Sequence, residues 1–400
     1  MDKPKVVLGV SGGIAAYKAC ELLRRLTESG HDVRVVPTAS ALHFVGSATW
    51  SALSGNPVST EVWSDVHEVP HVRIGQHADL VVVAPATADL LAKAAHGLAD
   101  DLLTNTLLTA RCPVVFAPAM HTEMWEHPAT QENVATLRRR GAIVIEPAVG
   151  RLTGVDTGKG RLPEPGEIFE VCRRVLARGT AEADLAGQHV VISAGGTREP
   201  LDPVRYLGNR SSGKQGYALA RTAAARGARV TLVSANAALP DPAGVDVVHV
   251  GTAVQLREAV LKAAADADAV VMAAAVADFR PAEYATGKIK KRDDRADPTI
   301  SLVRNPDILA EISADRARPG QVIVGFAAET DDVLANGRTK LERKGCDLLV
   351  VNEVGEHRTF GSEENEAVVL GADGSTTPVP YGPKEGLADV VWDLVRERLG

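Results

Sequence analysis

The sequence predicts an α/β protein built from two Rossmann-like, doubly wound units. Its 400 residues suit two domains at roughly 100–200 residues each. A short apolar strand followed by a glycine turn occurs twice, as KVVLGVSGGIAAYK at 5–18 and HVVISAGGTREP at 189–200. The strands are unbroken apolar runs, which indicates parallel sheets covered by helices on both faces. The polar, weakly patterned stretch 177–187 separates the repeats, so we predict domains at 1–180 and 181–400.

Strands and helices alternate along the first domain. The strands that the apolar runs predict are Lys5–Val10, Asp32–Val36, Leu80–Ala84, Val114–Ala117 and Ala142–Glu146. Amphipathic spacing predicts helices at Ile14–Ser29 and Asn133–Arg140.

The second domain repeats this alternation. Its predicted strands are Val190–Ser193, Arg229–Val233, Val245–Val250, Ala269–Ala273, Val322–Phe326 and Leu348–Val351. Its predicted helices are Gln215–Arg226, Val254–Ala265 and Asp332–Lys344. A hairpin of Glu366–Leu370 and Thr377–Val379, followed by a helix from Lys384, is expected at the end.

Composition excludes several classes of protein. Apolar residues make up 45% of the chain, too many for extended disorder, and no apolar run is long enough to cross a membrane. The N-terminus shows no signal-peptide pattern, and a net charge of −7 argues against a general nucleic-acid binder. Because the cysteines form no CxxC pair, disulfide framework or zinc spacing, we expect a reducing cytoplasm. These cysteines are Cys20, Cys112, Cys172 and Cys346.

The glycine turns suggest phosphate binding but not a dinucleotide site. Gly12 and Gly13 would let the backbone approach a phosphate at a helix N-terminus. Their spacing is not GxGxxG, and the second strands lead into 37–40 and 234–236, which hold no acid for a ribose. This counts against the alternative of a two-domain NAD-dependent oxidoreductase. Taken alone, such a turn is equally compatible with a tight connection that binds nothing.

Other candidates follow predicted strands. Thr87 and Asp89 would cap the next helix, and they also lie at the strand end where ligands bind in such folds. Met120 and His121 follow another strand, where packing is the simpler interpretation. His71 is a structural or surface histidine unless it faces a cofactor, where it could move a proton.

The ordered motifs point further than any single turn. In the first half they are GVSGGIAAYK (9–18), PHVRIGQHADLVVVAPATADLLAK (70–93), GLADDLLTN (97–105), APAM-x-x-x-MW (117–125) and G-x-GRLPEP (158–165). This series resembles the flavin-containing phosphopantothenoylcysteine decarboxylases. In the second half they are SAGGTREPLDPVRYLGNRSSGKQG (193–216), AAAVADF (273–279), KIKK (288–291), NPDI (305–308) and GFAAET (325–330). This series resembles the phosphopantothenate–cysteine ligases, and the fusion is similar to the bacterial bifunctional enzymes of coenzyme A biosynthesis.

For the first half, the resemblance implies oxidative decarboxylation with FMN. The flavin would take a hydride from the carbon bearing sulfur, CO₂ would leave, and the hydride would return. The implied FMN contacts are Gly12, Gly13, Ser40, Thr87 and Asn105. His71 matches the catalytic histidine and Met124 a methionine near the substrate, while His121 stands where the family often has a carboxylate-fixing asparagine.

The resemblance leaves the final proton donor open. The family's flap cysteine corresponds to Gly154 in this chain. Thr153, Asp156, His121 and water therefore remain candidates for this role.

For the second half, the resemblance implies activation of 4′-phosphopantothenate by CTP to an acyl-cytidylate, which the cysteine amine then attacks. Lys288 would lie near the triphosphate, Asp278 would contact the nucleotide or its Mg²⁺, and Asn209 would process the acyl-cytidylate. Further implied CTP contacts are Ala273, Ala274, Ala275, Asn305, Pro306, Asp307, Ile308, Phe326, Lys340 and Lys344. A phosphate-cradling loop without Walker A spacing is formed by Arg210, Ser211, Ser212 and Lys214.

Two interpretations stay open on charge and assembly. The basic run Lys288, Lys290, Lys291 and Arg292 would be a solvated loop on charge alone, and its motif context favours the triphosphate. The family implies ligase dimers joining decarboxylase trimers, a closed assembly such as a dodecamer. A third hypothesis about function, after the bifunctional enzyme and the NAD-dependent oxidoreductase, is a non-catalytic flavin-binding regulatory subunit. His71 and the complete second half argue against it.

Overall fold

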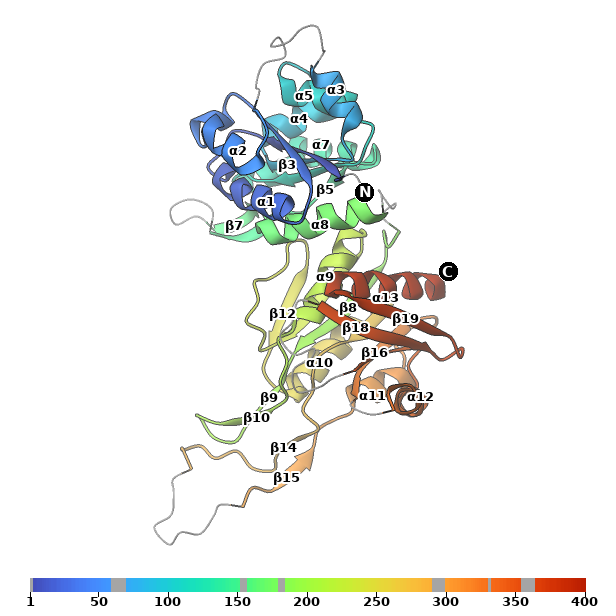
Figure 1. Cartoon of the computed structure of the whole chain (residues 1–400). Coiled ribbons are helices and arrows are strands. Elements are labelled where there is room, and N and C mark those ends of the chain that lie inside the picture. Colours follow the sequence, from blue (N-terminus) through green and yellow to red (C-terminus); the bar gives the residue numbers. More distant parts are fainter. Residues whose placement is uncertain are drawn as a thin grey trace. The chain divides into compact units, whose positions relative to one another are not determined.

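The chain forms two compact units, residues 1–182 and 183–400, close to the boundary expected from the sequence (Figure 1). The computed structural model describes residues 3–58, 70–151, 157–178, 184–289, 299–329, 332–353 and 364–400. Each unit has its own sheet and its own core.

The first unit contains a five-stranded parallel sheet in the order β2-β1-β3-β4-β5. This is the flavodoxin-like order. The chain first adds β2 on one side of β1 and then crosses to add β3 on the other side, which creates a switch point between β1 and β3. The strands are β1 (Lys5–Val10), β2 (Asp32–Pro37), β3 (Leu80–Ala86), β4 (Val114–Pro118) and β5 (Ile143–Val144). Only β5 is clearly shorter than its predicted strand.

Helices cover both faces of this sheet, as the apolar strands predicted. One face packs against α1 (Ala16–Glu28), α2 (Ser47–Ser54) and α8 (Pro165–Arg178). The other packs against α3 (Pro70–His77), α4 (Ala88–His96), α5 (Leu102–Thr109), α6 (Thr122–Glu126) and α7 (Pro128–Arg139). In α1 the buried residues recur at helical spacing, at Ala19, Leu22, Leu23 and Leu26.

The second unit holds an eight-stranded sheet in the order β12-β11-β8-β13-β16-β17-β18-β19. The strands up to β17 are parallel and follow the Rossmann order 3-2-1-4-5-6, which puts the switch point between β8 and β13. The strands are β8 (His189–Gly195), β11 (Arg229–Ala235), β12 (Asp246–Val250), β13 (Ala269–Met272), β16 (Val322–Glu329), β17 (Leu348–Glu353), β18 (Glu364–Gly371) and β19 (Thr376–Pro383). The last two form the predicted hairpin.

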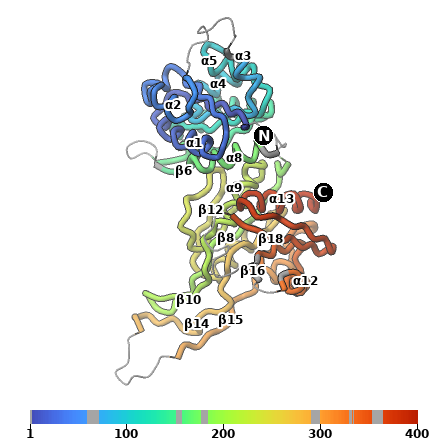
Figure 2. The backbone as a smooth tube through the Cα atoms, viewed as in Figure 1, coloured from blue at the N-terminus to red at the C-terminus, as the bar shows by residue number. Residues whose placement is uncertain are grey.

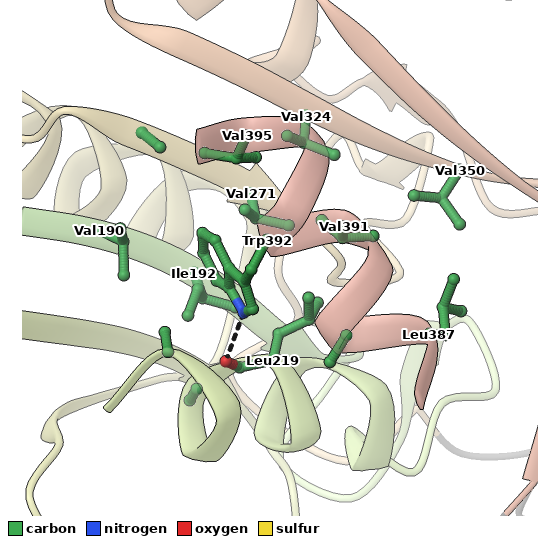
Figure 3. Close-up of a cluster of buried hydrophobic side chains, with 14 of the residues drawn as sticks. Val190, Ile192, Leu219, Val271, Val324, Val350, Leu387, Val391, Trp392 and Val395 are labelled. Atoms are coloured by element: carbon green, nitrogen blue, oxygen red, sulfur yellow. Dashed lines mark hydrogen bonds between the residues drawn. The ribbon is translucent and has the colours of Figure 1, made fainter. Parts of the chain in front are cut away.

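The helices of this unit also form two layers. On one face lie α9 (Lys214–Ala225) and α13 (Lys384–Leu399); on the other lie α10 (Ala253–Ala264), α11 (Ile308–Ala314) and α12 (Val333–Lys344). Trp392 of α13 is fully buried beside Ile192, and its indole N–H donates to the Leu219 carbonyl at 3.0 Å (Figure 3). That bond joins α13 to α9 and satisfies the indole's polar atom inside an apolar core.

Three short hairpins were not predicted. In the first unit, β6 (Ala148–Arg151) pairs with β7 (Thr157–Arg161); we call this hairpin the flap. In the second unit, β9 (Arg198–Pro200) pairs with β10 (Tyr206–Gly208), and β14 (Phe279–Pro281) pairs with β15 (Leu302–Arg304). The last two pairs project away from the sheet of that unit (Figure 2); we call them the β9–β10 arm and the β14–β15 arm. Within the described part of the chain, no helix is long and apolar enough to span a membrane.

Candidate active sites at the two switch points

A buried serine joins the loops at the first switch point. The Ser11 hydroxyl, on a residue only 2% exposed, donates to the Pro85 carbonyl at 2.7 Å and accepts from the Thr87 N–H at 3.0 Å. The Ser11 N–H also donates to the Pro85 carbonyl, at 3.2 Å. The chain after β1 is therefore fixed beside the chain after β3.

Most residues expected to hold the flavin lie together there. A side chain at Gly12 would overlap Ser40, and one at Gly13 would lie 3.9 Å from the Thr87 methyl carbon. Thr87 also caps α4, since its hydroxyl accepts from the Leu90 N–H at 3.3 Å. Among the described residues, the backbone N–H groups of 12–15 find no acceptor. The loop thus offers a close backbone and donors for an anion.

Asn105 lies one helix away from this loop. It is in α5, where its side-chain amide donates to the carbonyls of Ala99 (3.1 Å) and Asp101 (2.9 Å). Leu103 of the same helix occupies the space beside Gly9 of β1. The carboxamide is therefore held in one orientation by its own loop.

The base of the flap packs on the loop that carries His121. A side chain at Gly158 would collide with the Thr122 hydroxyl, and one at Gly160 with the Met120 carbonyl. The Met120 N–H donates to the Gly160 carbonyl at 2.9 Å. His121, exposed, is the residue that precedes α6. The motif G-x-G therefore permits a backbone contact that a larger residue would prevent.

Two ion pairs hold the same strand of the flap. Arg161 pairs with Glu164, which also binds Lys18 of α1 at 3.1 Å. Lys159 pairs with Glu146 at 2.7 Å. Although burial alone would raise it, the hydrogen bond from Lys159 helps to hold the pKa of the Glu146 carboxyl below its ordinary value.

Some expected residues of this unit are only partly described. His71 lies in α3, and its side chain is outside the described part; no helix was expected at this position. Met124 of α6 is 48% exposed. The flap positions Thr153, Gly154 and Asp156 lie outside the described residues.

The second switch point is joined in the same manner. The Ala275 N–H donates to the Gly195 carbonyl at 2.8 Å, and the Thr197 N–H donates to the Ala275 carbonyl at 3.2 Å. The fully buried Thr197 hydroxyl accepts from the Ala277 N–H at 2.9 Å. The Ala274 N–H donates to the Ser193 hydroxyl at 3.1 Å. The expected nucleotide residues that follow β13 are thus bonded to the glycine turn after β8.

The expected phosphate loop lies against that turn. The Asn209 side-chain amide donates to the Val276 carbonyl at 3.0 Å. A side chain at Gly196 would come within 2.8 Å of the Asn209 carbonyl oxygen and 3.4 Å of the Ser211 side chain. Gly213, at a φ of 78°, then starts α9, of which Lys214 is the first residue. Arg210 and Ser211 are exposed and Ser212 is half-buried, so the loop is open to a ligand at a helix N-terminus.

The segment 305–308 packs beside the same turn. The Asn305 N–H donates to the Asp278 carbonyl at 2.9 Å, and its side-chain amide to the Ala277 carbonyl at 2.8 Å. Asp307 caps α11 through the Ala310 N–H at 3.2 Å, and Ile308 is buried. The structure therefore brings this segment to the residues that follow β13.

One lysine of α12 contacts the segment 305–308. Lys344 pairs with Asp307 at 2.5 Å, and this hydrogen bond helps to hold the pKa of the Asp307 carboxyl below its ordinary value, against the effect of burial. Lys340 lies one turn earlier on α12, and Phe326 of β16 is half-buried. Because Lys344 already has a carboxylate partner, its charge is partly offset before any nucleotide binds.

Lys288 lies in the part of the β14–β15 arm that connects β14 to β15. Its side chain is exposed, and the segment is fixed by hydrogen bonds on either side of it. The Ala285 N–H donates to the Leu201 carbonyl at 3.1 Å, and the Ile289 N–H to the Asp202 carboxylate at 3.1 Å. The remaining cations of the run, Lys290, Lys291 and Arg292, lie outside the described residues.

The donor set suits a metal that arrives with phosphate. Across the described ranges, no three His, Cys, Asp or Glu side chains gather into a metal site. Asp278 is one exposed carboxylate beside the glycine turn. Mg²⁺ is commonly held by one or two carboxylates together with substrate phosphates, which this arrangement fits.

Comparison with known proteins covers both units. A flavoprotein family model matches residues 1–177, and the model for the C-terminal domain of the DNA/pantothenate metabolism flavoproteins matches 185–399. The coenzyme A biosynthesis bifunctional protein CoaBC of Mycolicibacterium smegmatis is 63% identical over 98% of this chain and 97% of its own. The chain belongs to the family of bifunctional coenzyme A biosynthesis proteins.

More distant relatives are similar over the whole chain or over its second unit. CoaBC of Vibrio cholerae is 44% identical, covering 99% of this chain and 98% of its own. A crystal structure of the C-terminal domain of a CoaBC protein is 33% identical, covers 55% of this chain and 98% of its own, and has a TM-score of 0.47. The family that the motifs indicated is confirmed, and so is the α/β class of both units.

Sequence reasoning missed the residues that join the loops. Ser11 and Thr197 each stand inside a quoted motif, Ser11 directly after β1 and Thr197 two residues after the end of β8. Asp202 and Glu164 lie in the motifs LDPVRY and GRLPEP. Ser11 and Thr197 could have been noticed as buried polar residues close to apolar strands. Which groups Asp202 and Glu164 bond depends on how distant segments of the chain come together.

Proposed function

We propose that this chain catalyses two successive steps of coenzyme A biosynthesis. The second unit would join 4′-phosphopantothenate to cysteine using CTP, and the first would decarboxylate the product to 4′-phosphopantetheine using FMN. The observation that supports this most strongly is the full-length match to bifunctional relatives. The two separate switch-point sites, each built around residues expected from the motifs, are consistent with it.

In the first unit, FMN would be held by the loops around Gly12, Gly13, Ser40 and Thr87. Bound FMN would supply reversible hydride transfer, the chemistry that no side chain provides. The N–H groups of 12–15 would bind its phosphate, and the hydroxyls of Ser40 and Thr87 would add donors. His71 would act as base or charge stabiliser, while His121 and Met124 would face the substrate beside the flap.

In the second unit, the substrate carboxylate would attack the α-phosphate of CTP and release pyrophosphate. Lys288 and a Mg²⁺ ion held by Asp278 would offset the charge that develops on the phosphates. The cysteine amine would then attack the acyl carbon and release CMP. The Asn209 amide, fixed through the Val276 carbonyl, would present its oxygen to the incoming amine.

One experiment tests both activities. Purified protein is incubated with 4′-phosphopantothenate, cysteine, CTP, Mg²⁺ and FMN, and the products are analysed by mass. We expect 4′-phosphopantetheine, CMP, pyrophosphate and CO₂; protein stripped of flavin should stop at phosphopantothenoylcysteine. A product that forms equally well without CTP, or a protein that takes up no FMN, would contradict the corresponding half.

Assembly and location follow from the same proposal. We expect a cytoplasmic homo-oligomer in which ligase dimers join decarboxylase trimers. Native mass spectrometry tests this directly: a single species of one protomer's mass at micromolar concentration contradicts it.

A further inference from the structure

We propose that Asp202 is a positioning residue for ligation. Its carboxylate ties the segment that carries Lys288 to the β9–β10 arm, and this arm leads directly to Asn209. The proposal rests on the proposed ligase function of the second unit. Asp202 itself would touch neither CTP nor the substrate; it would act through the backbone on either side of the site.

One oxygen of Asp202 builds the turn of the β9–β10 arm. Its Oδ1 accepts from the Val204 N–H and the Arg205 N–H, both at 2.8 Å. The Asp202 side chain is completely buried, although it lies in an arm that projects from the sheet. A carboxylate that accepts nearby backbone N–H groups in this way fixes the course of the chain through a turn.

The other oxygen reaches across to the segment that holds Lys288. Asp202 Oδ2 accepts from the Ile289 N–H at 3.1 Å and from Arg205 Nε (3.0 Å) and Nη2 (2.6 Å). Arg205 Nη2 also donates to the Ile289 carbonyl at 2.9 Å. The N–H and the C=O of the residue next to Lys288 are therefore both bound by one Asp–Arg pair.

This arrangement places two expected catalytic groups in a single frame. Lys288 is adjacent to Ile289, while Asn209 directly follows the last residue of β10 in the same arm. Arg205 holds the pKa of the Asp202 carboxyl well below its ordinary value, so the pair stays charged at neutral pH. An ammonium that must meet a triphosphate gains from being held near its working position in advance, since a misplacement of about 1 Å can cost on the order of a hundredfold in rate.

The primary variant is Asp202→Asn, which keeps an acceptor oxygen but loses the charge and one acceptor. We expect kcat/KM for CTP in ligation to fall about 10- to 100-fold, with decarboxylation of added phosphopantothenoylcysteine unchanged. The matched control is Asp347→Asn. Asp347 Oδ2 also accepts from a backbone N–H, that of Ile323 at 2.7 Å, and from an arginine, Arg316 at 2.8 Å. It precedes β17, at the amino-terminal ends of the parallel strands, whereas the switch point lies at their carboxyl ends. Ligation by this variant should therefore stay within about twofold of wild type.

A double-mutant cycle separates positioning from general structural damage. If Asp202 acts through Lys288, its substitution in a Lys288→Arg background should lower ligation by less than about threefold further. If Asp202→Asn fails to fold, Arg205→Lys serves in its place, because it keeps the charge but loses the paired contact with Asp202 and Ile289. Two results overturn the proposal. One is that the losses of ligation caused by Asp202→Asn and Lys288→Arg multiply in the double variant; the other is that Asp202→Asn lowers ligation no more than Asp347→Asn does.

The wild-type protein distinguishes the two levels of inference. CTP binding by calorimetry and pyrophosphate release are measured on the full chain first. If the wild type shows neither, the ligase function itself is wrong; if it shows both and Asp202→Asn matches it, only the positioning role is wrong.

Discussion

At both switch points a buried hydroxyl accepts a backbone hydrogen bond from the loop after a neighbouring strand, and we call this contact the joint. The residues that surround the joint differ between the two units. In the first unit the buried Ser11 hydroxyl accepts from the Thr87 N–H, and in the second the buried Thr197 hydroxyl accepts from the Ala277 N–H. Each joint satisfies a backbone donor that would otherwise be costly to bury. The sites differ in what surrounds the joint. The first is lined by glycines and small hydroxyl residues, whereas the second is flanked by two arms that bring charged side chains.

This difference matches the proposed ligands. A resident flavin needs a shaped, close-fitting loop, and a side chain at Gly12 would already collide with Ser40. A triphosphate that enters and leaves needs cations at a distance from the sheet, where the Asp202–Arg205 pair can hold Lys288. The two units therefore share a Rossmann-like arrangement of strands, and their ligands are selected by the loops and arms around the switch point rather than by the strands.

Removing the cation on the arm should have the largest effect of any change compared here. Lys288→Gln should lower CTP-dependent ligation by roughly 100- to 1,000-fold, as the loss of a group that stabilises developing charge does. Decarboxylation should be unchanged, because Lys288 belongs to the other unit. Pyrophosphate release and CO₂ release are measured on the same preparation. If both activities fall together while the fold is preserved, the two sites are not independent.

Filling the glycine loop should abolish flavin binding in the first unit. A side chain at Gly12 meets Ser40, including its backbone carbon at 3.0 Å, so the loop must shift; the overpacking should cost about 1–3 kcal/mol. Gly12→Ala should therefore purify without flavin absorbance and still ligate. Gly46→Ala is the control, since Gly46 lies in the same unit outside this loop and its added carbon would meet nothing within 4 Å. Flavin retained by Gly12→Ala would contradict the placement of the cofactor in this loop.

Periodicity predicted the sheets well because their strands are continuously apolar. The strand Lys5–Val10 was predicted to the residue, and the start of α13 at Lys384 likewise. The arms were missed since β10, β14 and β15 are three residues long and largely exposed, with no apolar face to detect.

The candidate sites were foreseen through motifs, and their joints were not. Gly12, Ser40 and Thr87 are far apart in the chain and meet only because β1 lies between β2 and β3. Asp202 and Ile289 are brought together by two arms whose pairing no local pattern encodes. Contacts that depend on strand order are thus beyond what residue spacing can show.

The two joints should be of similar strength if they are equivalent. Ser11→Ala and Thr197→Val each leave a backbone N–H without its acceptor, that of half-buried Thr87 and that of buried Ala277. The free energy of unfolding of the unit concerned should fall by about 1–3 kcal/mol. Hydrogen exchange reports each site separately, at the Thr87 amide and the Ala277 amide. Each substitution should speed exchange in its own unit only. Equal protection in wild type and variant would show that the hydroxyl is not the acceptor that matters.

The smallest effect should come from the ion pair under the flap. Glu146 has a folded-state pKa below its ordinary 4.5, so its contribution to stability is present above that value and is lost as the pH falls through the folded pKa. Glu146→Gln should lower the free energy of unfolding by up to about 1 kcal/mol at pH 7, and the difference from wild type should vanish in acid.

Decarboxylation by Glu146→Gln should fall by no more than about twofold, because Arg161 and Glu164 still anchor the same strand of the flap. The control is Glu21→Gln, which breaks an exposed pair with Arg25 within α1 and should cost about 0.3–0.5 kcal/mol without touching the flap. A tenfold loss of decarboxylation would mean that the flap is held as a single frame, as we propose for the β9–β10 arm. The contrast between a doubly anchored flap and an arm that depends on one buried carboxylate would then disappear.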